Sequence, residues 1–279
     1  MTLAASITLL LIQLVGSESA YTVQQGDSLT SVGARFGVNI RVLADENGIA
    51  PSSLLRPGQT LRVDNRHIVP ELADTVDALI TVNLPQKMLF FSIGDRLIRA
   101  VPIAAGKPSW RTPLGDFTVA VKETDPTWDV PVSIQEEMRR AGKPVLTRVL
   151  PSPENPLGKY WLGLSLPGIG IHGTNAPASI YSAATHGCIR VHPNDIELLF
   201  QEIEVGTRGR IVYEPVLIVR EGNSVFLEVH PDIYRKGIDV LRTTFDRARA
   251  GGLLYMVDFT RVEDVILKRE GIARDVTYR

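Results

Sequence analysis

Cys188 is the only cysteine of the chain, and it directly follows a His-Gly pair in the run Thr185-His186-Gly187-Cys188-Ile189-Arg190. A second such pair, His172-Gly173, lies upstream. The thiolate is the nucleophilic form of cysteine, yet a free thiol is only slightly ionised at neutral pH. An imidazole within hydrogen-bond reach can take the thiol proton and later return it to a leaving amine. Two neighbouring strands that bring His172 and Cys188 together would therefore carry out acyl transfer.

Two residues beside the cysteine extend this chemistry. Gly187 has no side chain and allows a substrate to approach the sulfur, and the backbone N–H groups of residues 187–188 can form an oxyanion hole. Arg190 lies two residues after Cys188, so on a strand both would face the same side. Its planar guanidinium suits a substrate carboxylate.

Two other interpretations of these residues stay open. A lone cysteine is often a buried, inert side chain. A metal site is the second, because zinc ligands occur among His172, His186, His192 and Cys188, although their spacing matches none of the familiar zinc patterns. We expect neither a metal nor another cofactor, since a thiol, an imidazole and backbone dipoles suffice for acyl transfer.

The elements that position these residues belong to a chain of 279 residues, enough for about two domains. It has 30 Lys+Arg against 31 Asp+Glu and a formal net charge of -1. This balance argues against a polybasic nucleic-acid-binding protein and against a highly charged disordered chain. Apolar residues make up 44%, enough for a core, and the scattered 23 Gly and 18 Pro favour a turn-rich, mainly β fold.

Residues 1–20 predict a secretory signal peptide, because the nearly continuous apolar run from Leu3 to Val15 is followed by small residues up to Ala20. The run is shorter than the roughly 20 apolar residues of a transmembrane helix. No Lys or Arg precedes Arg35, so an uncleaved anchor is the main alternative. We expect export to the periplasm or cell envelope, with no membrane span left after signal cleavage.

Residues 21–64 predict a small βααβ module. Leu29, Val32 and Phe36 have helical spacing between two strand-like segments. The runs Tyr-Thr-Val…Gly-Asp-Ser-Leu near its start and Leu-Arg-Pro-Gly-Gln-Thr-Leu near its end resemble a LysM domain. This resemblance implies binding of N-acetylglucosamine-containing glycans, such as the glycan strand of peptidoglycan.

Residues 78–213 predict a β-rich domain with short alternating strands. Between Glu123 and Lys159 lies a Pro-punctuated stretch with one helix, Ser133 to Ala141, which is long for a connection and predicts a lid or substrate wall. Residues 214–279 predict a C-terminal helical extension of unassigned role. His67 and His230 are expected at the surface, and Trp110, Trp128 and Trp161 are expected in the core or at a rim.

The pattern His-Gly-Thr-Asn…Ser-Ile…Thr-His-Gly-Cys-Ile-Arg closely resembles the YkuD-type (ErfK/YbiS/YcfS/YnhG) L,D-transpeptidases, in which an N-terminal LysM domain is also usual. Thr112-Pro113-Leu114-Gly115 and Asn155-Pro156-Leu157-Gly158 extend the resemblance over about residues 78–212. It implies a mainly β (α+β), sandwich-like catalytic domain in the bacterial cell envelope. The implied reaction is attack by Cys188 on the diaminopimelate carbonyl of a peptidoglycan tetrapeptide stem. D-alanine leaves, and the acyl group passes to an amine of another stem or of an envelope lipoprotein.

By the same resemblance, His172 is the general base, the Gly173 carbonyl orients its ring, and His186 shapes the pocket. The substrate-binding residues implied by the motif are Arg190, Gly187, Thr174 and Thr185. Tyr181, which stands where the family usually has glycine, and His192-Pro193 depart from the pattern. These departures touch no reacting group and bear on the preference for the acceptor.

Two alternative functions remain. The same thioester can pass to water, which would make the protein an L,D-carboxypeptidase or amidase. The chain can also be a catalytically silent peptidoglycan-binding protein, although the intact set of His172, His186, Cys188 and Arg190 argues against that.

Overall fold

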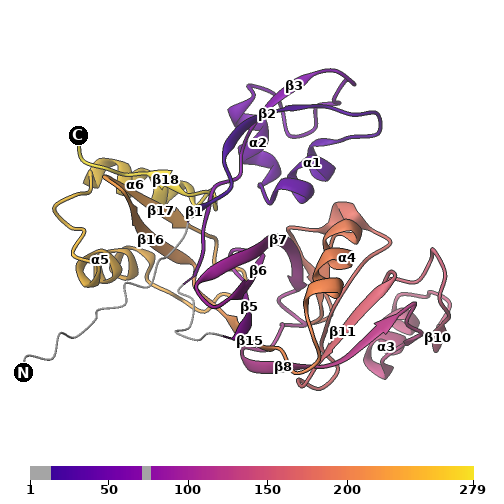
Figure 1. The fold of residues 1–279 in the computed structure, drawn as a ribbon. Helices are drawn as coiled ribbons and strands as arrows, with labels where there is room; N and C mark the ends of the chain where they lie inside the picture. Colours follow the sequence, from indigo (N-terminus) through magenta and orange to yellow (C-terminus); the bar gives the residue numbers. More distant parts are fainter. Residues whose placement is uncertain (1–13, 71–76) are drawn as a thin grey trace, which may run out of the picture.

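The computed structural model describes residues 14–70 and 77–279, which form three packed parts (Figure 1). A small N-terminal module, drawn in indigo, lies above a central β domain, and a C-terminal domain, drawn in yellow, lies beside both.

The N-terminal module has the predicted βααβ order. Its elements are β2 (Glu18–Thr22), α1 (Leu29–Phe36), α2 (Ile40–Glu46) and β3 (Thr60–Asp64). Ser28 caps α1 by accepting a hydrogen bond from the Ser31 N–H, and Gly37 ends the helix with a φ of 70°. The helical spacing of Leu29 and Val32 places both side chains on one face of α1. That face packs in an apolar core with residues of β3.

Part of the predicted signal peptide is folded. Residues 1–13 lie outside the described residues, but β1 (Leu14–Val15) pairs with β4 (His67–Ile68), and β2 pairs with β3 from Glu18 onward. Cleavage after residue 20 would therefore remove β1 and part of β2. Across residues 14–70 and 77–279, no helix has the length and apolar character needed to span a membrane.

The central domain is a nine-stranded sheet in the order β13-β7-β14-β12-β11-β8-β15-β5-β6. Its strands are β5 (Ala78–Asn83), β6 (Met88–Ile93), β7 (Arg96–Gly106), β8 (Gly115–Thr124), β11 (Tyr160–Leu164), β12 (Gly170–His172), β13 (Ala183–Thr185), β14 (Ile189–Val191) and β15 (Arg208–Val212). β7 also pairs with β6, so the sheet closes into a barrel-like ring. This closure is possible because β7 is 11 residues long and its two halves pair with different strands, β6 and β14. The mainly β prediction is confirmed.

The predicted lid connects β8 to β11. It contains β9 (Trp128–Asp129), α3 (Val132–Arg140) and β10 (Arg148–Val149), and α3 has no buried side chain. Helix α4 (Pro193–Glu202) packs on β11 and starts at Pro193. It starts there because Pro193 fits a first helical turn and His192 Nδ1 accepts the Asn194 N–H. The short η1 (Pro177–Ser179) lies between His172 and Cys188.

The C-terminal domain contains more than the predicted helices. Its elements are β16 (Val216–Glu221), β17 (Ser224–Val229), α5 (Val240–Ala250), α6 (Phe259–Lys268) and β18 (Arg274–Asp275). The three strands form a separate sheet, on which the two helices bury an apolar core. The surface prediction for His67 and His230 was wrong, because each is only 1% exposed. Both bond to the buried carboxylate of Glu228, which needs partners away from water.

Candidate active site

The two halves of the motif lie on neighbouring strands. β12 and β14 run parallel, and their register pairs Ile171 with Ile189 and His172 with Arg190. Cys188 directly precedes β14, so it lies on the same face of the sheet as Arg190 and His172. The charge of Arg190 acts on the pKa of both His172 and Cys188, as expected for three side chains that converge.

His172 is buried and held in one orientation. Its ring stacks on Trp161 with the centroids 5.8 Å apart, and Nδ1 lies 2.7 Å from the Gly173 carbonyl oxygen. A carbonyl oxygen only accepts hydrogen bonds, so Nδ1 carries the proton and Nε2 is left as an acceptor. Burial, followed by the charge of Arg190, lowers the pKa of His172 to about 4. The ring is therefore neutral at neutral pH, as a general base must be.

Cys188 is half-buried, and its Sγ lies 3.5 Å from the Gly168 carbonyl oxygen. Burial raises the pKa of the thiol, against a backbone hydrogen bond from Gly170 and the charge of Arg190, which both lower it. The resting site thus holds a neutral thiol and a neutral imidazole rather than an ion pair. From this state, attack by the sulfur would require a base to take the thiol proton, and the neutral His172 ring could do so.

A tight turn presents the thiol. Thr185 Oγ1 donates to the Cys188 carbonyl oxygen at 2.6 Å and accepts the Gly187 N–H at 3.2 Å. Gly187 has a φ of 112°, in the region that favours glycine, and its carbonyl oxygen accepts from Thr112 Oγ1 at 2.8 Å. Thr185 is buried and holds the turn, and since the Gly187 N–H is already bonded, the Cys188 N–H is the donor that we assign to an oxyanion.

The predicted substrate-binding residues Thr174 and Arg190 have different surroundings. Thr174 is buried, and its Oγ1 accepts the Ala176 N–H at 2.9 Å, so it shapes the chain after His172. Arg190 Nη1 donates to Ser179 Oγ at 2.7 Å, whereas its Nε has no partner within the described part of the chain. The planar guanidinium suits a substrate carboxylate, but the Nε atom is itself buried.

His186 connects the motif to the lid. Its Nε2 lies 2.5 Å from Glu137 Oε2 on α3, and Lys107 Nζ bonds the other oxygen of Glu137 at 2.8 Å. Hydrogen bonds from Lys107 and His186 lower the pKa of Glu137 to about 2. The side chain of Glu137 is therefore ionised at neutral pH and ties the lid helix to the turn that carries Cys188.

A pocket of about 310 Å³ opens between the thiol and the lid. Its lining residues are Glu123, Pro126, Thr127, Trp128, Asp129, Pro131, Ile134, Leu157, Trp161, Gly168, His186 and Cys188. Trp128 and Trp161 form part of its wall, and Trp110 packs edge-on against His186 at 5.2 Å between centroids. The predicted lid thus faces the predicted nucleophile.

The sequence did not point to Glu137 or Lys107. Their bonds to His186 span 49 and 79 residues along the chain, and no local pattern reveals such contacts. The zinc alternative also lacks convergence: His172 bonds Gly173, His186 bonds Glu137 and His192 caps α4. In the part of the chain that the structure describes, no three metal-ligating side chains cluster.

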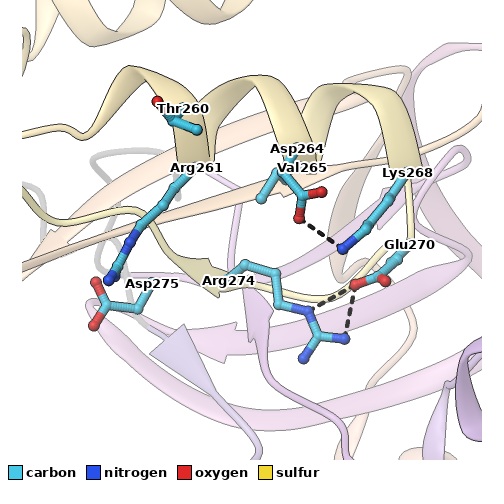
Figure 2. Close-up of a pocket in the computed structure, with 8 residues that line it drawn as sticks. All are labelled: Thr260, Arg261, Asp264, Val265, Lys268, Glu270, Arg274 and Asp275. Carbon is cyan, nitrogen blue, oxygen red and sulfur yellow. Dashed lines mark hydrogen bonds and ion pairs between the residues drawn. The ribbon is translucent and has the colours of Figure 1, made fainter. Parts of the chain in front are cut away.

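A second cleft, of about 510 Å³, lies in the C-terminal domain along α6 (Figure 2). Figure 2 shows Lys268 bonded to Asp264 and Arg274 bonded to Glu270. The remaining charges of the cleft are also paired, Arg261 with Asp258 and Asp275 with Arg279. Because each charge already has a partner within the chain, we assign this cleft a structural role.

Acyl transfer through a thioester is the chemistry that the Cys188 site can perform, which places the chain among enzymes with a cysteine nucleophile. Comparison with known proteins gives the family. Residues 77–218 match the L,D-transpeptidase catalytic domain named YkuD, and residues 21–64 match the LysM domain. The chain belongs to the YkuD family of L,D-transpeptidases.

Two curated relatives agree with this assignment. The chain is 31% identical over 223 residues to the probable L,D-transpeptidase YbiS of Escherichia coli K12, covering 78% of this chain and 72% of YbiS. It is 29% identical over 283 residues to the probable L,D-transpeptidase ErfK/SrfK of Salmonella typhimurium, covering 95% of this chain and 88% of that protein. A solved L,D-transpeptidase from Mycobacterium smegmatis is 22% identical with a TM-score of 0.38, over 49% of this chain and 58% of that one.

Proposed function

We propose that this protein is an exported enzyme of the bacterial cell envelope that cross-links or anchors peptidoglycan stems through Cys188. The single observation that carries this proposal is the shared sheet face of Cys188, His172 and Arg190 beside the lid pocket. The match of residues 21–64 to LysM supports peptidoglycan as the polymer, with the glycan strand on the LysM domain and the stem peptide at the thiol.

The first half-reaction forms the thioester. The Cys188 thiol gives its proton to His172 Nε2, and Sγ attacks the carbonyl carbon of the diaminopimelate L-centre in a tetrapeptide stem. The Cys188 N–H donates to the oxyanion that forms. The carbon–nitrogen bond to D-alanine then breaks, and His172 returns the proton to the leaving amine.

The second half-reaction consumes the thioester. An acceptor amine loses a proton to His172 and attacks the thioester carbonyl, and the sulfur leaves and is reprotonated. The acceptor that we propose is the amine of another stem or of an envelope lipoprotein. Arg190 binds a substrate carboxylate through its guanidinium, whose Nη1 is oriented by Ser179.

Intact-protein mass spectrometry tests the proposal. Wild type and Cys188→Ala are mixed with a purified disaccharide-tetrapeptide muropeptide, and free D-alanine is measured in parallel. We expect D-alanine release and a stem-sized adduct on the wild type alone. Release of a tripeptide stem with a free carboxylate, in place of an amide to an acceptor amine, would favour the hydrolase alternative. Glycan binding with neither adduct nor D-alanine would favour the silent wall-binding protein.

β-lactams provide an independent probe, because their strained amide carbonyl mimics the attacked stem carbonyl. We expect at least one β-lactam class to add its mass to Cys188, with no addition to Cys188→Ala. Failure of every class tested to modify the wild type would contradict a reactive thiol at this position.

A further inference from the structure

Tyr181 has an unusual backbone conformation in the loop between His172 and Cys188. Its φ is 62°, in the left-handed region that large side chains rarely adopt. A residue held there costs folding free energy and persists only where its surroundings fix it. The contacts of the Tyr181 side chain must therefore offset the cost of this backbone conformation.

The side chain of Tyr181 is held from several sides at a junction of all three domains. Its hydroxyl donates to the Gly271 carbonyl oxygen at 3.4 Å, and Lys87 Nζ lies 4.3 Å from the ring centroid. His67 lies beside it, with ring centroids 6.3 Å apart. The Tyr181 N–H donates to the Ile103 carbonyl oxygen on β7 at 2.9 Å.

The junction itself is tightly bonded. The buried carboxylate of Glu228 on β17 accepts from His67 and His230, each at 2.8 Å, and from Gln86 at 3.0 Å. His67 Nε2 lies 3.1 Å from the Gly37 carbonyl oxygen at the end of α1. One carboxylate of the C-terminal domain thus joins the central domain and, through His67, the N-terminal module.

The segment that accepts the Tyr181 hydroxyl bond is anchored as well. Ile272 is buried in the core of the N-terminal module, and Arg274 pairs with Glu46 of α2 and Asp64 of β3 at 2.6 and 2.9 Å. Gly271 has a φ of 74°, and a Cβ there would lie 2.8 Å from His230 Nδ1. The Gly271 carbonyl is therefore a fixed point between two domains.

The other end of the Tyr181 loop reaches the substrate-binding arginine. Ile180 is buried with Ala34 of α1 and Ala104 of β7. Ser179 Oγ accepts from Arg190 and donates to the Ala176 carbonyl oxygen at 2.6 Å. The loop thus links the three-domain junction to the guanidinium beside Cys188.

We propose that Tyr181 is a positioning residue through which the N-terminal and C-terminal domains hold Ser179, and through Ser179 the side chain of Arg190, in place for the substrate carboxylate. The two flanking domains are then parts of the substrate-binding machinery rather than tethered accessories. This inference rests on the proposed function for its kinetic consequence, but the anchoring of the loop stands on geometry alone.

Three full-length variants test it. Tyr181→Gly tolerates the positive φ and removes the whole side chain. Tyr181→Phe keeps the ring and removes only the hydroxyl. Tyr255→Gly is the control, because it repeats the glycine substitution at a tyrosine that is 79% exposed. For each protein, hydrogen exchange of the peptide 174–185 and steady-state D-alanine release are measured. Alkylation of Cys188 by iodoacetamide serves as a reaction that needs no carboxylate recognition.

For Tyr181→Gly we expect faster exchange in residues 174–185 and a KM raised about five- to tenfold, with kcat and the alkylation rate within about twofold of wild type. Tyr181→Phe, which loses only the hydrogen bond to Gly271, should show a smaller rise in loop exchange and KM, and Tyr255→Gly should stay near wild type. An unchanged exchange rate in residues 174–185 of Tyr181→Gly overturns the proposal. An exchange rate that rises equally along the whole chain also overturns it. If that variant fails to fold, Tyr181→Asn, which tolerates positive φ, replaces it. A wild type that releases no D-alanine refutes the proposed function, while the exchange data still decide the anchor.

Discussion

Glu137 of α3 accepts a hydrogen bond from His186, the residue two positions before Cys188, with 2.5 Å between Oε2 and Nε2. Lys107 bonds the second carboxylate oxygen, so one exposed side chain of α3 joins two points of the catalytic domain. α3 has no buried side chain, and this contact therefore substitutes for the apolar packing that holds other helices. Polar contacts that water and salt can weaken therefore fix α3 to the catalytic domain.

Glu137→Gln should loosen the lid. The amide keeps the shape of the side chain but loses the charge that attracts Lys107 and strengthens the hydrogen bond with His186. We expect Cys188 to react about two- to fivefold faster with a bulky maleimide, and the effect of added salt on this rate to shrink. Glu136→Gln, on the neighbouring position of α3, is the matched control. Equal maleimide rates in wild type and Glu137→Gln would show that this contact does not restrain the lid.

The pH profile of acylation should report on His172. Because burial lowers its pKa to about 4, the neutral ring that accepts the thiol proton persists well below neutral pH. The rate of thioester formation should therefore fall only as the pH drops through about 4, and His172→Gln should reduce it about 10²- to 10⁴-fold. Stopped-flow acylation by a β-lactam between pH 3.5 and 8 measures both. A midpoint near 6.5 would mean that the ring is not buried in solution.

The sequence was most informative where the chemistry is local. Cys188, His172 and Arg190 lie within a short stretch, and alternation on two strands suffices to place them on one face. His67 and Glu228 lie 161 residues apart, so neither neighbourhood in the sequence indicates their pairing, and the surface expectation for His67 failed for this reason. Tyr181 stood out as a departure from the family pattern, but only its backbone angle and its contact with Gly271 give that departure a physical meaning.

Tyr234 of the C-terminal region should stabilise the turn that carries Cys188. Its buried hydroxyl donates to the Gly106 carbonyl oxygen at 2.9 Å and accepts the Thr112 N–H at 3.1 Å, and Thr112 in turn bonds Gly187. Tyr234→Phe leaves both backbone groups unpaired and should lower the free energy of unfolding by about 1–3 kcal/mol. Urea denaturation measures this change. Tyr278→Phe, at a tyrosine 70% exposed, should change it little, and equal losses in both variants would contradict the prediction.

The three-domain junction should make the stability of the protein depend on pH. Burial lowers the pKa of His230, although the Glu228 carboxylate raises it, and Lys87 and His67 also face this site. For Glu228, burial alone would raise the pKa, but His67 and His230 more than offset this and lower it to about 2. Both groups thus bind protons less readily in the folded state than in the unfolded chain.

The sign of the effect follows from linkage. A histidine with a depressed pKa stays neutral in the folded protein, while the unfolded chain takes up a proton below about pH 6.5, so stability is lost as the pH falls through that value. His230→Gln can keep a hydrogen bond to Glu228 without titrating. Between pH 6.5 and 5, it should flatten the pH dependence of unfolding by up to about 1.4 kcal/mol per pH unit. Urea denaturation of wild type, His230→Gln and the control His192→Gln at pH 7.5, 6 and 5 tests this. Parallel curves for all three proteins would show that the junction does not titrate on folding.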